Sequence, residues 1–199
     1  SVSFNNPIKT LSNKYFFIIL LRFFYLLLYI VELYYKKRGE ILVKNLKARH
    51  FDAYYCANKE EALQKALELI QPHTSVFLDA STTNLALARS LPDINLNVFT
   101  TGPSIALELC RLHNPVVTLC CGTINRKNLA LSGQNTLEML EKINIDMAFI
   151  GVSGCSVDAG FTCGTEGDML VKRLVIQKAR TSVVMCTQEK LRCLMPYTF

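Results

Sequence analysis

Beyond residue 57 the chain alternates between short apolar runs and segments whose apolar positions repeat with a helical period. The apolar runs predict strands at residues 75–80, 96–101, 115–122, 146–153 and 181–187. The segments between them predict helices at residues 82–91, 103–112, 134–143 and 166–180. Strands that are apolar throughout and alternate with helices indicate a parallel sheet that is covered on both faces. We therefore predict an α/β fold with a mainly parallel, doubly wound sheet of about five strands and helices on both faces.

A further helix is predicted just before the first strand. Asn58 is a typical N-cap residue, and Glu60 and Glu61 follow in the first turn, where the helix dipole favours acidic side chains. The apolar residues of KEEALQKALELI fall on one helical face, and Pro72 ends the segment.

The N-terminal fifty residues have a different composition. They contain nine Lys and Arg and two acidic residues, a net charge of +7, whereas the remaining 149 residues sum to −1. Tyr15–Tyr35 is a run of 21 residues with two charges, Arg22 and Glu32, and as a helix it would be about 31 Å long. Because the excess of basic residues is confined to residues 1–50, the rest of the protein does not present a basic surface of the kind that coats nucleic acids.

Three interpretations of the apolar N-terminal helix remain open. It could contact or span a membrane through Tyr15–Tyr35, with the cluster at residues 36–38 as a cytoplasmic anchor. It could be a buried helix packed against a partner. It could also be a non-native segment, since enrichment in Phe, Tyr, Leu, Ile, Lys and Asn is typical of out-of-frame reading of AT-rich DNA. We predict that residues 1–47 form this segment and that residues 48–199 form one domain.

Polar residues follow the first predicted strand. In open parallel sheets, ligands bind beyond the carboxyl ends of the strands. Asp79, Ser81, Thr82 and Thr83 occupy that position and open a helix, so hydroxyls and backbone N–H groups could bind a phosphate monoester. The alternative is a helix cap with incidental hydroxyls.

Other strand ends carry similar residues. Thr101, Gly122 and Gly151 lie at the ends of the second, third and fourth predicted strands, and Arg126 comes four positions after Gly122. Arg126 could hold a phosphate or carboxylate with its planar guanidinium, or it could be a solvated loop residue.

Several kinds of site are not indicated. There is no GxGxxG after the first strand, no GxxxxGK[ST], no GxSxG and no zinc-type spacing of His and Cys. We expect no metal and no cofactor, and we interpret the eight Cys as mostly buried small residues in a reducing compartment.

From about residue 48 to residue 190 the chain resembles the C-terminal sensor domain of DeoR-family transcriptional regulators. The similarity lies in the order of VFLDASTTNLALARSL, NVFTTGPSIALEL, LCCGTINRKNLALSGQNTLEML and the stretch from IDMAFIGVSG to VVMCTQEKL. The resemblance implies a fold related to ribose-5-phosphate isomerase, a phosphorylated sugar as effector, a homo-oligomer and a cytoplasmic location. It also implies site roles for Asp79, Ser81, Thr82 and Thr83 (the phosphate loop), Gly122 and Arg126 (a GG-x-x-R turn) and Lys172 (near the sugar).

Three departures from that family shape the functional expectation. The usual acidic residue after Gly151 is missing, no helix-turn-helix is recognisable in residues 1–50, and the chain ends where the family continues into a closing element. We expect a non-catalytic effector-binding domain of a sugar-metabolism repressor, C-terminally truncated and reaching operator DNA only through a helix-turn-helix not visible here. The alternatives are a sugar-phosphate isomerase using Glu166 and Lys172, which are six residues apart and should not be assumed to pair, and a membrane-tethered sensor.

Overall fold

The computed structural model describes residues 36–199, apart from residues 42, 49–51, 157 and 192. The chain divides into two compact units, Ser1–Ala57 and Asn58–Phe199. In the first, residues 36–41 and 43–47 are helical, and Lys47 Nζ lies 5.8 Å from the centre of the Tyr54 ring. Tyr15–Tyr35 lies outside the described residues, so its three interpretations remain predictions. Among the residues that are described, no helix combines the length and apolar character that a membrane span requires.

A five-stranded sheet forms the centre of the second unit. Its order is β3 (Val116–Leu119), β2 (Asn97–Thr100), β1 (Ser75–Leu78), β6 (Ile145–Gly151) and β9 (Ala179–Met185). Every neighbouring pair is parallel. The predicted α/β fold with a parallel sheet of five strands is confirmed.

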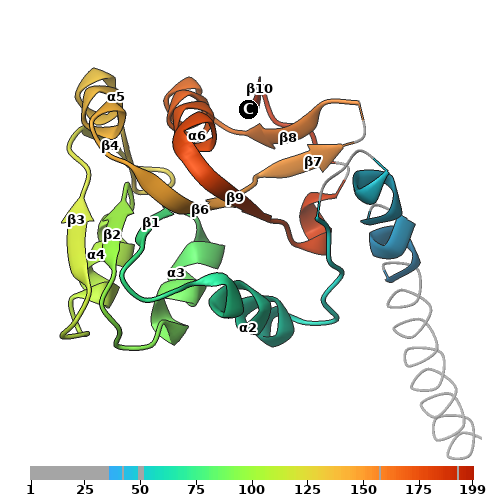
Figure 1. The fold of residues 1–199 in the computed structure, drawn as a ribbon. Coiled ribbons are helices and arrows are strands. Elements are labelled where there is room, and N and C mark those ends of the chain that lie inside the picture. Colours follow the sequence, from blue (N-terminus) through green and yellow to red (C-terminus); the bar gives the residue numbers. More distant parts are fainter. Residues whose placement is uncertain (1–35, 42, 49–51, 157, 192) are drawn as a thin grey trace, which may run out of the picture. The chain divides into compact units, whose positions relative to one another are not determined.

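Helices cover both faces of this sheet (Figure 1). They are α2 (Lys59–Leu69), α3 (Thr82–Ser90), α4 (Pro103–Leu109), α5 (Gln134–Glu141) and α6 (Glu166–Lys178). One buried cluster joins β1, β2 and β6 to α2, α3 and α4, and a second joins β1 and β6 to α5 and α6. This is the doubly wound arrangement that the sequence predicted.

The alternation of side chains along β1 explains how one strand serves both cores. Val76 and Leu78 belong to the cluster under α2–α4, and Phe77 between them belongs to the cluster under α5 and α6. All three are at most 1% exposed. A strand that is buried on both faces reads as a continuous apolar run, and for that reason the sequence revealed it.

The two smaller sheets were not predicted. β4 (Thr123–Asn125) and β5 (Ala130–Ser132) form an antiparallel hairpin, and β7 (Gly154–Ser156), β8 (Gly160–Cys163) and β10 (Tyr197–Thr198) form a three-stranded antiparallel sheet. These strands are two to four residues long and mostly polar or glycine-containing, so they lack an apolar run. Several predicted boundaries were also wrong; α6, for example, ends at Lys178, because Ala179 already pairs with Ile145 in the sheet. The expectation of mostly buried cysteines was wrong as well, since three are buried, one is half-buried and four are exposed: Cys110, Cys121, Cys186 and Cys193.

The strand order creates a switch point between β1 and β6. From β1 the chain winds outward through β2 to β3, and it then returns to place β6 on the other side of β1. Connections from β1 and β6 therefore leave in opposite directions and open a crevice beyond their carboxyl ends. The residues that follow these two strands are Asp79 and Val152.

Candidate functional site

Asp79 connects the two strands that flank the switch point. Its Oδ2 accepts the Gly151 N–H at 2.9 Å, and its Oδ1 accepts the Ser81 N–H at 3.0 Å. Asn84 Nδ2 donates to the same Oδ1 at 2.7 Å and to the Phe149 carbonyl, also at 2.7 Å. Because Asp79 is buried and all its bonds are internal, its role in this structure is to fix the backbone at the ends of β1 and β6.

Lys172 of α6 completes a buried charge cluster with Asp79 and Asp168. Its Nζ lies 3.1 Å from Asp79 Oδ2 and 3.2 Å from Asp168 Oδ2, and it donates to the Gly151 carbonyl at 2.6 Å. An ammonium group has three hydrogens, so these three acceptors use them all. The Phe199 ring, whose centre is 5.0 Å from Nζ, covers the group with an aromatic surface.

Burial and charge oppose each other in this cluster. Burial alone would lower the pKa of Lys172, but the charges of Asp79 and Asp168 outweigh it, so the pKa lies above the ordinary lysine value. The pKa of Asp168 is raised, chiefly by burial and further by the charge of Asp79, although Lys172 pulls it down. One lysine facing two carboxylates leaves the cluster with one excess negative charge when both acids are ionised.

The start of α3 lies beside this cluster. Ser81 is the N-cap, and its Oγ accepts the Asn84 N–H at 3.2 Å. Thr82 and Thr83 form the first turn, where backbone N–H groups have no partner within the helix. The helix dipole and these donors favour an anion at this position.

Gly151 allows the close approach of β6 to the α3 cap. A methyl group at this position would overlap both Cβ and Oγ of Ser81. Only glycine therefore fits here, which explains the glycine that the sequence places at this strand end.

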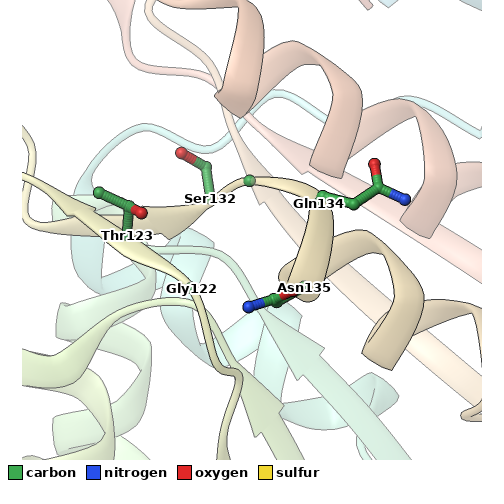
Figure 2. Close-up of a pocket in the computed structure, with 6 residues that line it drawn as sticks. Gly122, Thr123, Ser132, Gln134 and Asn135 are labelled. Carbon is green, nitrogen blue, oxygen red and sulfur yellow. The ribbon is translucent and has the colours of Figure 1, made fainter.

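A polar hollow of about 260 Å³ lies at the start of α5 (Figure 2). Its lining is uncharged and consists of Gly122, Thr123, Ser132, Gly133, Gln134 and Asn135. The hairpin that carries it is attached to the end of β2, since the Leu131 N–H donates to the Thr101 carbonyl at 2.8 Å. On its other side Ser132 Oγ packs against Gly167, in the first turn of α6.

The structure brings some of the predicted site residues together and separates others. Asp79, Ser81, Gly151 and Lys172 form one connected network. Gly122 lines the hollow, while Arg126 lies in the exposed turn between β4 and β5. The ligand-binding role of all these residues stays a prediction.

Two residues in the network were missed by the sequence reasoning. Lys172 pairs with Asp168, four residues earlier on α6, whereas Glu166 is exposed. The four-residue spacing was a usable signal, because such positions are neighbours on a helix. Asn84 gave no signal: its amide is fully buried, and its Oδ1 has no hydrogen-bond partner among the described residues.

Comparison with known proteins assigns this domain to a family. Residues 56–199 match the family described as the DeoR C terminal sensor domain. The chain belongs to this family. The match covers the whole of the parallel sheet, the charge cluster and the hollow, so the site lies within the DeoR sensor domain.

Two similar proteins illustrate the relationship. The HTH-type transcriptional regulator GlpR of Haloferax volcanii is 32% identical over 134 residues, which are 67% of this chain and 52% of that protein. The HTH-type transcriptional repressor GlcR of Bacillus subtilis is 33% identical over 126 residues, 63% of this chain and 48% of that protein. This chain therefore spans about half the length of such relatives.

Among solved structures, ribose 5-phosphate isomerase A of Methanocaldococcus jannaschii is similar to this chain with a TM-score of 0.47 and 15% identity, over 67% of this chain and 53% of that protein.

Proposed function

We propose that this DeoR sensor domain binds a phosphorylated sugar and is the effector-binding part of a cytoplasmic repressor of sugar metabolism. The observation that carries the proposal is the position of the α3 N-terminus, at the sheet's switch point and held there by Asp79. The phosphate would bind the N–H groups of Thr82 and Thr83 and the hydroxyls of Ser81, Thr82 and Thr83, while the Ser81 N–H stays bonded to Asp79. The uncharged hollow beside Thr123 and Ser132 would bind the hydroxyls of the sugar.

A non-catalytic role agrees with the chemistry of the cluster. Sugar isomerisation needs groups that can take up and release a proton. Lys172 has its three hydrogens engaged within the protein, and Glu166 is exposed at the start of α6. These observations favour binding over the isomerase alternative, which turnover of ribose 5-phosphate would establish.

The names of the relatives supply the rest of the proposal. GlpR and GlcR are HTH-type regulators, so we propose that effector binding here changes the affinity of a helix-turn-helix for operator DNA within a homo-oligomer. The contact of Tyr15–Tyr35 with a membrane remains a prediction from sequence.

A thermal-shift panel tests the proposed ligand class. The full chain is heated with inorganic phosphate, sugar phosphates and the corresponding unphosphorylated sugars. A ligand at about 100 times its Kd stabilises the fold by roughly 2.7 kcal/mol, which shifts Tm by a few degrees. We expect shifts with the phosphorylated compounds and none with their parents.

Two cap variants locate the binding site. Ser81→Ala removes the cap of α3, and Asn58→Ala removes the equivalent cap of α2, which lies away from the switch point. Only Ser81→Ala should lose the phosphate-dependent shift. Equal shifts with phosphorylated and unphosphorylated sugars, or no shift on a folded chain, would contradict the proposed function.

A further inference from the structure

The Gly151 peptide is held on both sides by the charge cluster. Its N–H donates to Asp79 Oδ2 at 2.9 Å, and its carbonyl accepts from Lys172 Nζ at 2.6 Å. Asp79 also holds the Ser81 N–H, so one ion pair sets the backbone at the end of β6 and at the start of α3. The start of α3 belongs to the anion site proposed above, and the end of β6 packs directly against its Ser81.

Asp168 is the one member of the cluster that, among the described contacts, makes no bond to the Gly151 peptide or to the Ser81 N–H. Lys172 and Asp79 already neutralise each other, and their side chains are 4% and 3% exposed. A second carboxylate in the same place is disfavoured by burial, and this raises the pKa of Asp168. Because burial of this carboxylate costs stability, we expect Asp168 to contribute something else to the structure.

The geometry indicates what that role is. Asp168 lies one helical turn before Lys172 and holds Nζ from the α6 side at 3.2 Å. Lysine has a long and flexible side chain, so a second anchor restricts Nζ to the position from which it reaches both Asp79 and the Gly151 carbonyl. Asp168 itself makes no hydrogen bond to Ser81 or Gly151 in the described structure.

We propose that Asp168 is a positioning residue for the anion site: through Lys172 and Asp79 it fixes the Ser81 N–H and the Gly151 peptide. The inference rests on the proposed function, because it concerns the same site. It adds a residue that binds no ligand but sets the geometry of the groups that do.

Amide hydrogen exchange in the full chain tests this positioning directly, without any ligand. In Asp168→Asn we expect exchange at Ser81 and Gly151 to be about tenfold faster, since their acceptor Asp79 is no longer held in place. Asp168→Glu keeps the charge within reach of Lys172 and should preserve slow exchange.

Asp146→Asn is the matched control. Asp146 lies near the opposite end of β6, and its Oδ2 accepts the Ser75 N–H at 2.9 Å. This variant should accelerate exchange at Ser75 and leave Ser81 and Gly151 unchanged. Faster exchange at all three amides in Asp168→Asn would show a general loss of stability and would overturn the inference, as would unchanged exchange at Ser81 and Gly151.

Binding of inorganic phosphate, measured by calorimetry, connects positioning to function. Asp168→Asn should weaken phosphate binding by about fivefold or more, and Asp146→Asn should leave it unchanged. If Asp168→Asn binds phosphate as tightly as the unaltered chain does, the inference about Asp168 is wrong and the proposed function still stands. A folded, unaltered chain that binds no phosphate would instead overturn the proposed function, while the exchange data still decide whether Asp168 holds the two peptides.

Discussion

Substitution of Gly151 by Ala tests whether the close approach of β6 to α3 builds the site. The added methyl group would overlap Cβ and Oγ of Ser81, so the α3 cap must move. Overpacking of this kind typically costs about 1–3 kcal/mol, and loss of the Ser81 cap would add about 1 kcal/mol. We expect the free energy of unfolding to fall by about 2–4 kcal/mol.

Urea unfolding at neutral pH measures this loss, and Gly164→Ala provides the control. A methyl group at Gly164 would meet Met195 Cε at 3.6 Å, an ordinary contact, so its effect should be within about 0.5 kcal/mol. Phosphate binding should be lost in Gly151→Ala and kept in Gly164→Ala, because only the former displaces Ser81. If both variants unfold at the same urea concentration, the reasoning from close approach is refuted.

Three further substitutions test the cluster, the core and a cap. Lys172→Met leaves buried Asp79 and half-buried Asp168 without a counter-charge, so the free energy of unfolding at pH 7.5 should fall by about 3–5 kcal/mol. Because burial raises the pKa of Asp168, this loss should shrink at pH 5 as Asp168 takes up a proton, and urea titrations at both pH values measure it. Burial raises the pKa of Cys120 from 9.0 to about 12, so the neutral thiol stabilises the fold below pH 9 and this contribution is lost as the pH rises towards 12. Cys120→Ala should therefore have a stability profile that is shallower over this range, by up to about 1.4 kcal/mol per pH unit, while an unchanged slope would exclude Cys120 as the titrating group. Asn58→Ala should lower the free energy of unfolding by about 1 kcal/mol in the same urea assay, since its side chain caps α2; no change would mean that the cap is dispensable.

The parallel sheet could be predicted because its central strands, β1 and β6, are largely buried and its edge strands are still rich in apolar residues. Phe77 and its neighbours form an uninterrupted apolar run, Asn58 caps the helix before the first strand, and Ser81 caps the helix after it. Local sequence and tertiary burial point to the same structure in these segments.

The small antiparallel sheets could not be predicted for the opposite reason. β4, β7 and β10 are only two or three residues long, and β10 pairs with β8, which lies more than thirty residues earlier in the sequence. No periodic pattern develops in two to four residues. Tertiary pairing alone defines such strands.

The candidate site was predictable as a location but not as a network. The strand-end rule placed Asp79, Ser81 and Gly151 together, and the structure joins them by hydrogen bonds. The strand-end rule gave no indication that Asp79 is buried and accepts its hydrogen bonds from within the protein. Sequence alone also did not separate Asp168 from Glu166: both are acidic residues in the first turn of α6, and only the fold shows which of them is near Lys172.

The network also explains how a ligand at this site could affect the rest of the domain. The groups proposed to bind phosphate share acceptors with the ion pair that joins β1, β6 and α6. If a ligand binds there as proposed, we expect it to order Ser81 and Asp79, and through them Lys172 and the start of α6, where Asp168 lies. Coupling of this kind needs no large movement, because binding energy is converted into a tighter packing of elements that already touch. The buried charge cluster is thus the physical route by which occupancy of the α3 N-terminus would be transmitted to α6.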